Sequence, residues 1–108
     1  MLEKILITSV KNCLNIPDEI RCQAENIRNI TESIFDESYI VFLDEQIGLN
    51  ARGYEWTNRL KERKKVLKKY CNVRLLTGDI KVNGKYCSIK VDPATEKVIY
   101  WEMFDESY

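Results

Sequence analysis

The chain contains no histidine among its 108 residues. This absence excludes Ser-His-Asp and Cys-His nucleophile pairs, a histidine general base and every metal site that requires imidazole. The cysteines do not indicate a metal site in its place, because they occur singly and form no C-x-x-C pair: Cys13, Cys22, Cys71 and Cys87. We therefore expect no metal, no cofactor and none of the common hydrolase designs.

Long apolar runs are also missing. The longest, residues 39–43, is far shorter than the roughly 20 residues that a membrane helix requires. The N-terminal sequence MLEKILITSVKN lacks the basic, apolar and small-residue pattern of a secretory signal. These features predict a cytoplasmic protein that does not contact a membrane and whose thiols stay reduced.

Glycine and proline are scarce, at four and two residues, and no linker rich in Gly, Ser or Pro marks a domain boundary. A chain of 108 residues fits one domain and can bury a core without disulfides. The sequence therefore predicts a single domain over residues 1–108.

Charge is distributed unevenly, although 17 basic and 17 acidic residues cancel. Residues 52–74 carry nine Lys or Arg and two Glu, whereas residues 18–45 carry eight acids and two Arg. One cationic and one anionic region indicate a charged partner, which is either another molecule or a second copy in a homodimer.

Apolar spacing predicts three helices, over residues 2–14, about 16–35 and 54–71. The short apolar run at 39–43 has β-branched and aromatic members, which favours a strand buried on both faces and parallel to a neighbour. Residues 44–53 then become a loop that is long enough to have a functional role.

The C-terminal third gives the clearest pattern. Asn83-Gly84 between alternating residues is a strong hairpin signal, because a type I′ turn needs positive φ at both positions. A two-residue loop pairs Val82 with Lys85, and alternation then divides the side chains between two faces. The predicted core face carries Leu76, Ile80, Cys87, Ile89 and Val91, and the opposite face carries Thr77, Asp79, Lys81, Tyr86, Ser88 and Lys90.

A third strand follows at 98–104, with Ile99, Trp101 and Met103 directed at the core and a bulge or odd-length loop at the turn. The elements together predict an α+β fold, with three helices packed on one face of a four-stranded, mainly antiparallel sheet. Its C-terminal part is a three-stranded meander.

The helix at 54–71 carries the first candidate binding residues: Lys61, Lys64, Lys65, Lys68 and Lys69. Like charges at i,i+4 cost roughly 0.2–0.5 kcal/mol per pair in an isolated helix. An unpaired row of this kind is typical of a surface that contacts phosphates. The ordinary alternative is a solvated face whose lysines meet water or the chain's own acids.

The polar face of the hairpin adds Lys81, Tyr86 and Lys90, with Tyr100 as a further candidate. Basic residues interleaved with aromatic rings suit single-stranded nucleic acid, in which bases stack and phosphates meet lysine. The solvent face of any one-sided antiparallel sheet has a similar composition.

These observations favour a small non-catalytic protein that binds an anionic partner through the lysine-rich helix. Nucleic acid is the first candidate, and DNA, RNA and an acidic protein surface stay open. An alternative is an inhibitor or adaptor of a nucleic-acid-binding enzyme, of the kind that mobile elements encode, acting through acids such as Glu25 and Glu32. A third hypothesis is a histidine-free ribonuclease that uses Arg74, Lys81 and Tyr86.

Overall fold

The computed structural model describes residues 2–105, which divide into two compact units. The first unit combines residues 2–33 with residues 74–105, and the second contains residues 34–73. The assignment of the chain to one domain stays a prediction.

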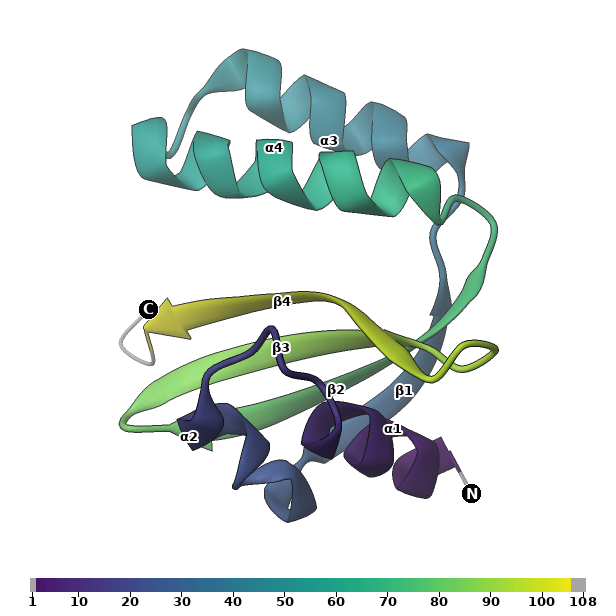
Figure 1. The fold of residues 1–108 in the computed structure, drawn as a ribbon. Helices are drawn as coiled ribbons and strands as arrows, with labels where there is room; N and C mark the ends of the chain where they lie inside the picture. Colours follow the sequence, from purple (N-terminus) through teal and green to yellow (C-terminus); the bar gives the residue numbers. More distant parts are fainter. Residues whose placement is uncertain (1, 106–108) are drawn as a thin grey trace. The chain divides into compact units, whose positions relative to one another are not determined.

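The first unit contains the sheet and the N-terminal helices (Figure 1). Its helical elements are α1 (Leu2–Lys11), α2 (Asp18–Arg21) and the 3₁₀ turn η1 (Ala24–Asn26). Its strands are β1 (Arg28–Ile34), β2 (Arg74–Val82), β3 (Lys85–Asp92) and β4 (Lys97–Asp105). They form an antiparallel sheet in the order β1-β2-β3-β4. The predicted α+β class, the four-stranded antiparallel sheet and the C-terminal meander are confirmed.

The β2–β3 hairpin has the predicted register. Asn83 and Gly84 both have positive φ, at 52° and 75°, as a type I′ turn requires. Val82 pairs with Lys85, and the ladder continues to Leu76 opposite Val91. All five residues predicted for the core face are at most 2% exposed. The alternation therefore directs the polar residues between them to the opposite face.

The meander contains the irregularity expected between β3 and β4. Lys90 pairs with Tyr100 whereas Val91 pairs with Val98, so Ile99 is the extra residue of a bulge. Val98 therefore packs against the core at the place predicted for Ile99. Trp101 and Met103 pack there as predicted.

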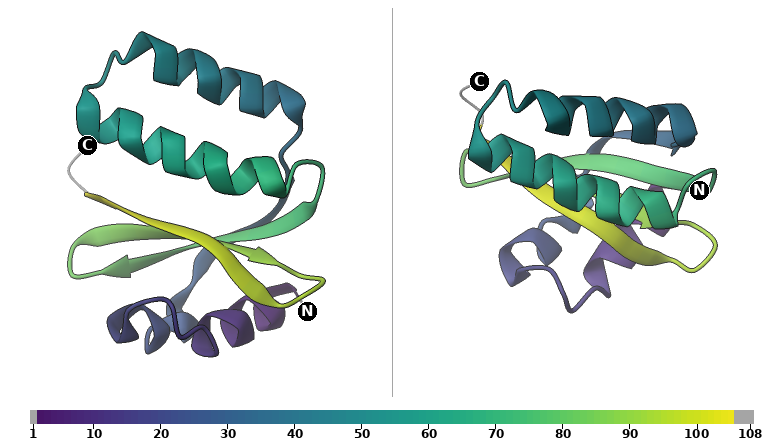
Figure 2. Two further views of the ribbon diagram at one scale, coloured as in Figure 1. Left: turned by 45° about the horizontal axis from the view of Figure 1, so that its top comes forward. Right: turned by 90° about the horizontal axis from the view of Figure 1, so that it is seen from above.

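One hydrophobic core holds the first unit together. Leu6 and Val10 of α1, Ile20 of α2 and Ile27 are at most 2% exposed and belong to one cluster with the core face of β2 and β3. Figures 1 and 2 show α1 and α2 along the same face of the sheet.

The predicted helix at 16–35 is wrong beyond its first turns. Ile20, Ala24 and Ile27 are buried as their spacing implies, but α2 and η1 are single turns and β1 begins at Arg28. The segment from Arg28 becomes a strand because it pairs with β2, a partner more than 40 residues away in the sequence. Such tertiary pairing overrides local helical spacing.

The second unit is a helical hairpin of α3 (Glu37–Leu49) and α4 (Tyr54–Lys69). Figures 1 and 2 show the two helices side by side. The long helix predicted at 54–71 is confirmed as α4. At the end of the hairpin opposite the α3–α4 loop, the backbone amide of Asn72 donates a hydrogen bond to the Phe35 carbonyl at 2.8 Å.

The strand predicted at 39–43 and the loop predicted at 44–53 are wrong, because α3 covers most of both segments. The Asp36 carboxylate caps the helix, accepting hydrogen bonds from the Ser38 hydroxyl at 2.5 Å and the Tyr39 amide at 3.2 Å. These bonds lower the pKa of the Asp36 carboxyl. Only Leu43 of the apolar run is fully buried, while Val41 and Phe42 are about half exposed. The helix ends at Asn50, whose φ of 48° is left-handed.

A glycine sets the distance between β2 and the elements packed on it. A Cβ at Gly78 would lie 2.5 Å from Cγ2 of Ile27 and 2.6 Å from Cδ2 of Leu6. Gly78→Ala should therefore destabilise the protein by about 1–3 kcal/mol, the usual cost of overpacking a core. Urea unfolding followed by circular dichroism measures this change.

Gly48→Ala is the matched control for this substitution. Gly48 lies inside α3, and nothing within 4 Å would contact its Cβ. Alanine there should stabilise the helix by about 0.5–1 kcal/mol. Equal effects at the two positions would contradict the proposed close packing at Gly78.

Candidate nucleic-acid interface

Helix α4 separates a buried side from a cationic side. Thr57, Leu60 and Leu67 are buried. Lys61, Lys65, Lys68 and Lys69 are exposed. Lys61, Lys65 and Lys68 follow one another at spacings of four and three residues, so they lie in one row along the helix. We call Lys61, Lys65, Lys68 and the adjacent Lys69 the lysine stripe.

The lysine stripe is not neutralised by the part of the chain that the structure describes. Lys64 forms an ion pair with Asp44 of α3, and its side chain is 31% exposed. No such pair is found for Lys61, Lys65, Lys68 or Lys69 within residues 2–105. The structure therefore divides the five predicted lysines into one that is paired inside the hairpin and four that face outward.

Tyr54 extends this surface and was missed in the sequence analysis. It is 78% exposed and begins α4. Tyr54 and Asn58 precede Lys61 by seven and three residues, so both lie in the same row. From Tyr54 to Lys68 the row is about 21 Å long at 1.5 Å per residue. The signal was available in the helical spacing, which places a ring at the end of a row of lysines.

The residues predicted on the sheet lie in the first unit, whereas the lysine stripe lies in the second. Lys81 and Tyr86 are direct cross-strand partners on β2 and β3. Lys90 pairs with Tyr100 of β4 and lies four positions from Tyr86, or about 13 Å along the strand. The structure thus brings Lys81 and Tyr86 together and places Lys90 in a second pair.

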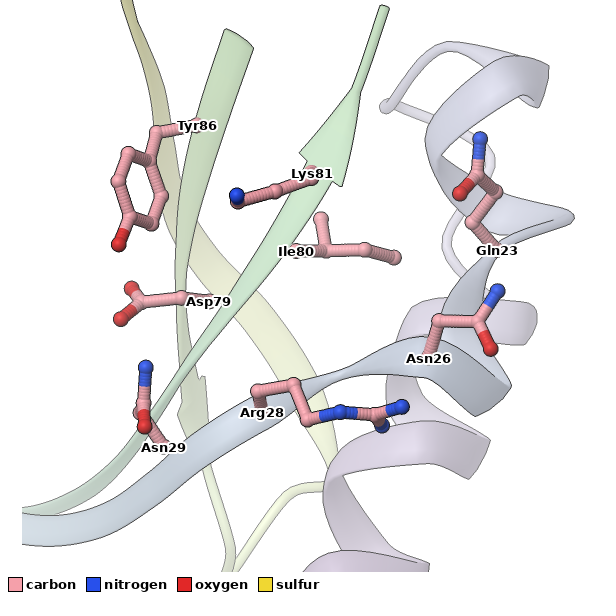
Figure 3. A pocket seen from close by; sticks show the side chains of 8 residues that line it. All are labelled: Gln23, Asn26, Arg28, Asn29, Asp79, Ile80, Lys81 and Tyr86. Carbon is pink, nitrogen blue, oxygen red and sulfur yellow. The ribbon is translucent and has the colours of Figure 1, made fainter. Parts of the chain in front are cut away.

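Lys81 and Tyr86 also line a cavity of about 400 Å³, which Figure 3 shows from close by. The other lining residues are Gln23, Asn26, Arg28, Asn29, Asp79 and Ile80. They come from η1 and its flanks, the start of β1, and β2. Asn29 has a φ of 57° within β1, which marks an irregular start of the strand beside the cavity. The sequence analysis did not identify Arg28 or Asn29, because they reach the cavity only through the pairing of β1 with β2.

The acidic segment does not present a continuous row of unpaired carboxylates. Glu25 lies on η1 and Glu32 on β1, so they do not belong to one helix, as the predicted helix over about 16–35 implied. Six of the eight acids have partners within the chain: Asp18 with Arg21, Glu19 with Asn83, Glu25 with Lys11, Glu32 with Arg74, Asp44 with Lys64, and Asp36 with Ser38 and Tyr39. These contacts weaken the case for an acidic inhibitor.

The three residues considered for ribonuclease chemistry are not assembled. Arg74 is at the start of β2, seven positions before Lys81, which corresponds to about 23 Å of extended chain. Its guanidinium is 2.8 Å from the Glu32 carboxylate. Arg74 therefore does not reach a group held by Lys81 and Tyr86.

The described part of the chain contains neither a metal-binding cluster nor a helix that could cross a membrane. Residues 2–105 contain no group of three or more His, Cys, Asp or Glu side chains arranged to hold a metal ion. Within the same range, no helix combines the length and the apolar character needed to cross a membrane.

Comparison with known proteins provides no further guide to function. No protein-family model, no curated protein and no solved structure matches the chain. The assignment of function therefore depends on the residues and geometry described above.

The cysteines differ sharply in expected reactivity. Cys22 is exposed, whereas Cys87 is fully buried. Burial raises the pKa of the Cys87 thiol to about 12, so its nucleophilic thiolate is scarce at neutral pH. Iodoacetamide at pH 8 should modify Cys22 in the folded protein and Cys87 only after unfolding. Peptide mass spectrometry distinguishes the sites, and equal rates at both would contradict the burial of Cys87.

Proposed function

We propose that this protein binds single-stranded nucleic acid, without catalysing a reaction, through the lysine stripe of α4. The observation that carries the proposal is the contrast on this helix between Lys64, which pairs with Asp44, and four exposed lysines without such a partner among the described residues. An anionic chain that follows the helix would relieve their mutual repulsion.

The neighbouring Tyr54 favours a single strand over a duplex. A ring that is 78% exposed can stack on an unpaired base, whereas duplex bases are already stacked. Phosphates on one strand would meet Lys61, Lys65 and Lys68 in succession. This combination of a stacking ring and a cationic track is a general mode of single-strand binding.

The first test removes three charges from the lysine stripe. Lys61→Gln, Lys65→Gln and Lys68→Gln together should weaken binding of a labelled single-stranded oligonucleotide. The slope of log K against log salt should become shallower by about 2, since each neutralised phosphate contributes about 0.7 on single strands. Fluorescence anisotropy over a salt series measures both quantities.

Lys64→Gln is the control for this variant, because Lys64 lies on the same helix but is paired with Asp44. It should change the affinity and the salt slope much less. Absence of binding by the unmodified protein at low salt, or equal effects of the two variants, would refute the proposal.

The second test concerns the ring at the start of α4. Tyr54→Ala should lower affinity for the single strand roughly fivefold to a hundredfold, in line with about 1–3 kcal/mol per stacked base. The salt slope should stay unchanged, because the ring carries no charge. Tyr54→Phe, which keeps the ring, should bind like the unmodified protein. A phenylalanine variant as weak as the alanine variant would exclude stacking.

A further inference from the structure

We propose that the protein forms a symmetric homodimer in which strand β4 pairs antiparallel with β4 of a second copy. The strand lies in the first unit and shares no residue with the lysine stripe. The inference therefore does not depend on the proposed function of α4.

Strand β4 is an edge strand of the sheet. In the order β1-β2-β3-β4 it pairs with β3 alone, and Figures 1 and 2 show it, in yellow, at the margin of the sheet. It is nine residues long and contains no proline. The bulge at Ile99 bends the strand near its start, and pairing with β3 is regular from Tyr100 to Asp105. A regular edge of this kind can pair with another strand through its N–H and C=O groups.

The register of the sheet determines which backbone groups of β4 point outward. Val82 and Lys85 flank a two-residue turn, so they exchange both backbone hydrogen bonds, and such pairs alternate with unbonded pairs along the ladder. The same alternation passes to β4 through the partners on β3. It identifies three residues of β4 whose backbone groups bond to β3: Tyr100, Glu102 and Phe104.

Trp101 and Met103 lie between these residues, so their amide and carbonyl groups point to the open edge. Neither residue forms a hydrogen bond outside the ladder with β3 within residues 2–105. Both side chains pack against the hydrophobic core, which holds the backbone that carries the outward groups. Binding groups on such a rigid element have a defined geometry.

The charges of β4 favour a second copy of the same strand. Lys97 begins the strand and Asp105 ends it, so antiparallel pairing brings the basic end of each strand beside the acidic end of the other. On β3, Asp92 lies opposite Lys97 and Lys85 lies opposite Asp105. The signs would therefore alternate across the four strands on each side of the dimer axis, which is a favourable arrangement.

Charge also selects the register of the two copies. A symmetric pair uses the same surface twice, so the twofold axis passes through one residue pair. An axis at Trp101 places Tyr100 opposite Glu102 of the second copy, whereas an axis at Glu102 would place two carboxylates directly opposite each other, which is destabilising. The Tyr100 hydroxyl donates to Glu102 of its own strand at 2.9 Å, so the two side chains are compatible neighbours. The bulge at Ile99 lies outside these central pairs.

The first test combines sedimentation velocity with amide hydrogen exchange measured by NMR on the full chain. The protein should change from monomer to dimer between micromolar and millimolar concentration. The Trp101 amide should exchange about tenfold or more slowly in the dimer than in the monomer, because it gains a partner. The Glu102 amide should be protected at both concentrations. A protein that stays monomeric at millimolar concentration, or a dimer without added protection of Trp101, would overturn the proposal.

The second test exchanges the charges at the two ends of β4. Lys97→Glu and Asp105→Lys should each raise the dissociation constant of the dimer about fivefold, as expected for exposed charge pairs. The double variant restores opposite charges and should dimerise like the unmodified protein. Circular dichroism checks that each variant is folded. Single variants that dimerise unchanged, or a double variant weaker than both, would contradict antiparallel pairing of β4.

A third variant distinguishes this interface from the proposed nucleic-acid surface. The triple lysine variant of α4 should dimerise as the unmodified protein does. Loss of the dimer in that variant would show that the copies meet at α4, and would contradict an interface at β4.

Discussion

The register of the β2–β3 hairpin is the constraint on which the first unit depends. Because successive residues of a strand face opposite sides, the pairing of Val82 with Lys85 determines the direction of every side chain between Leu76 and Val91. A shift by one residue would expose the apolar face and bury Asp79 and Lys81. The same register that forms the core therefore places Lys81 beside Tyr86 on the polar face of the sheet.

The second unit depends on charge as much as on packing. The Asp44–Lys64 pair joins α3 to α4 at a partly exposed position, where such pairs stabilise a protein by only about 0–1 kcal/mol. The stability of the hairpin therefore comes mainly from buried residues such as Leu43, Leu60 and Leu67. The lysine stripe contributes nothing comparable to folding, since its members are exposed and repel one another. The lysine stripe is therefore the part of the hairpin for which we propose a binding role.

Elements determined by interactions close in the sequence were predicted correctly, whereas elements determined by pairing between distant segments were not. The Asn83–Gly84 hairpin was predictable because a local turn signal and a period of two agree. Helix α4 was predictable because a long segment has consistent helical spacing. Strand β1 was not, because Ile20, Ala24 and Ile27 suggest a helix whose continuation is decided by pairing with β2. Helix α3 was missed because a five-residue apolar run does not distinguish a strand from part of a helix.

Prediction of the candidate sites from the sequence was limited in the same way. The lysines of α4 and the pair Lys81 and Tyr86 were recognisable as residue types in a pattern. The ion pair that neutralises Lys64 could not be predicted, because it requires α3 to be a helix beside α4. Arg28 likewise lines the same cavity as Asp79 only through the order of strands in the sheet. Local patterns thus identified the charged groups, and tertiary structure decided which of them stay available.

The two candidate surfaces belong to different units, so residue-level mapping can separate them. The most direct measurement of the central claim is a titration of the isotopically labelled protein with a short single-stranded oligonucleotide, followed by amide chemical shifts in NMR spectra. The account predicts the largest changes in α4, at Tyr54 and along the lysine stripe, with little change in α1. Shift changes that leave residues 54–69 unaffected would contradict it.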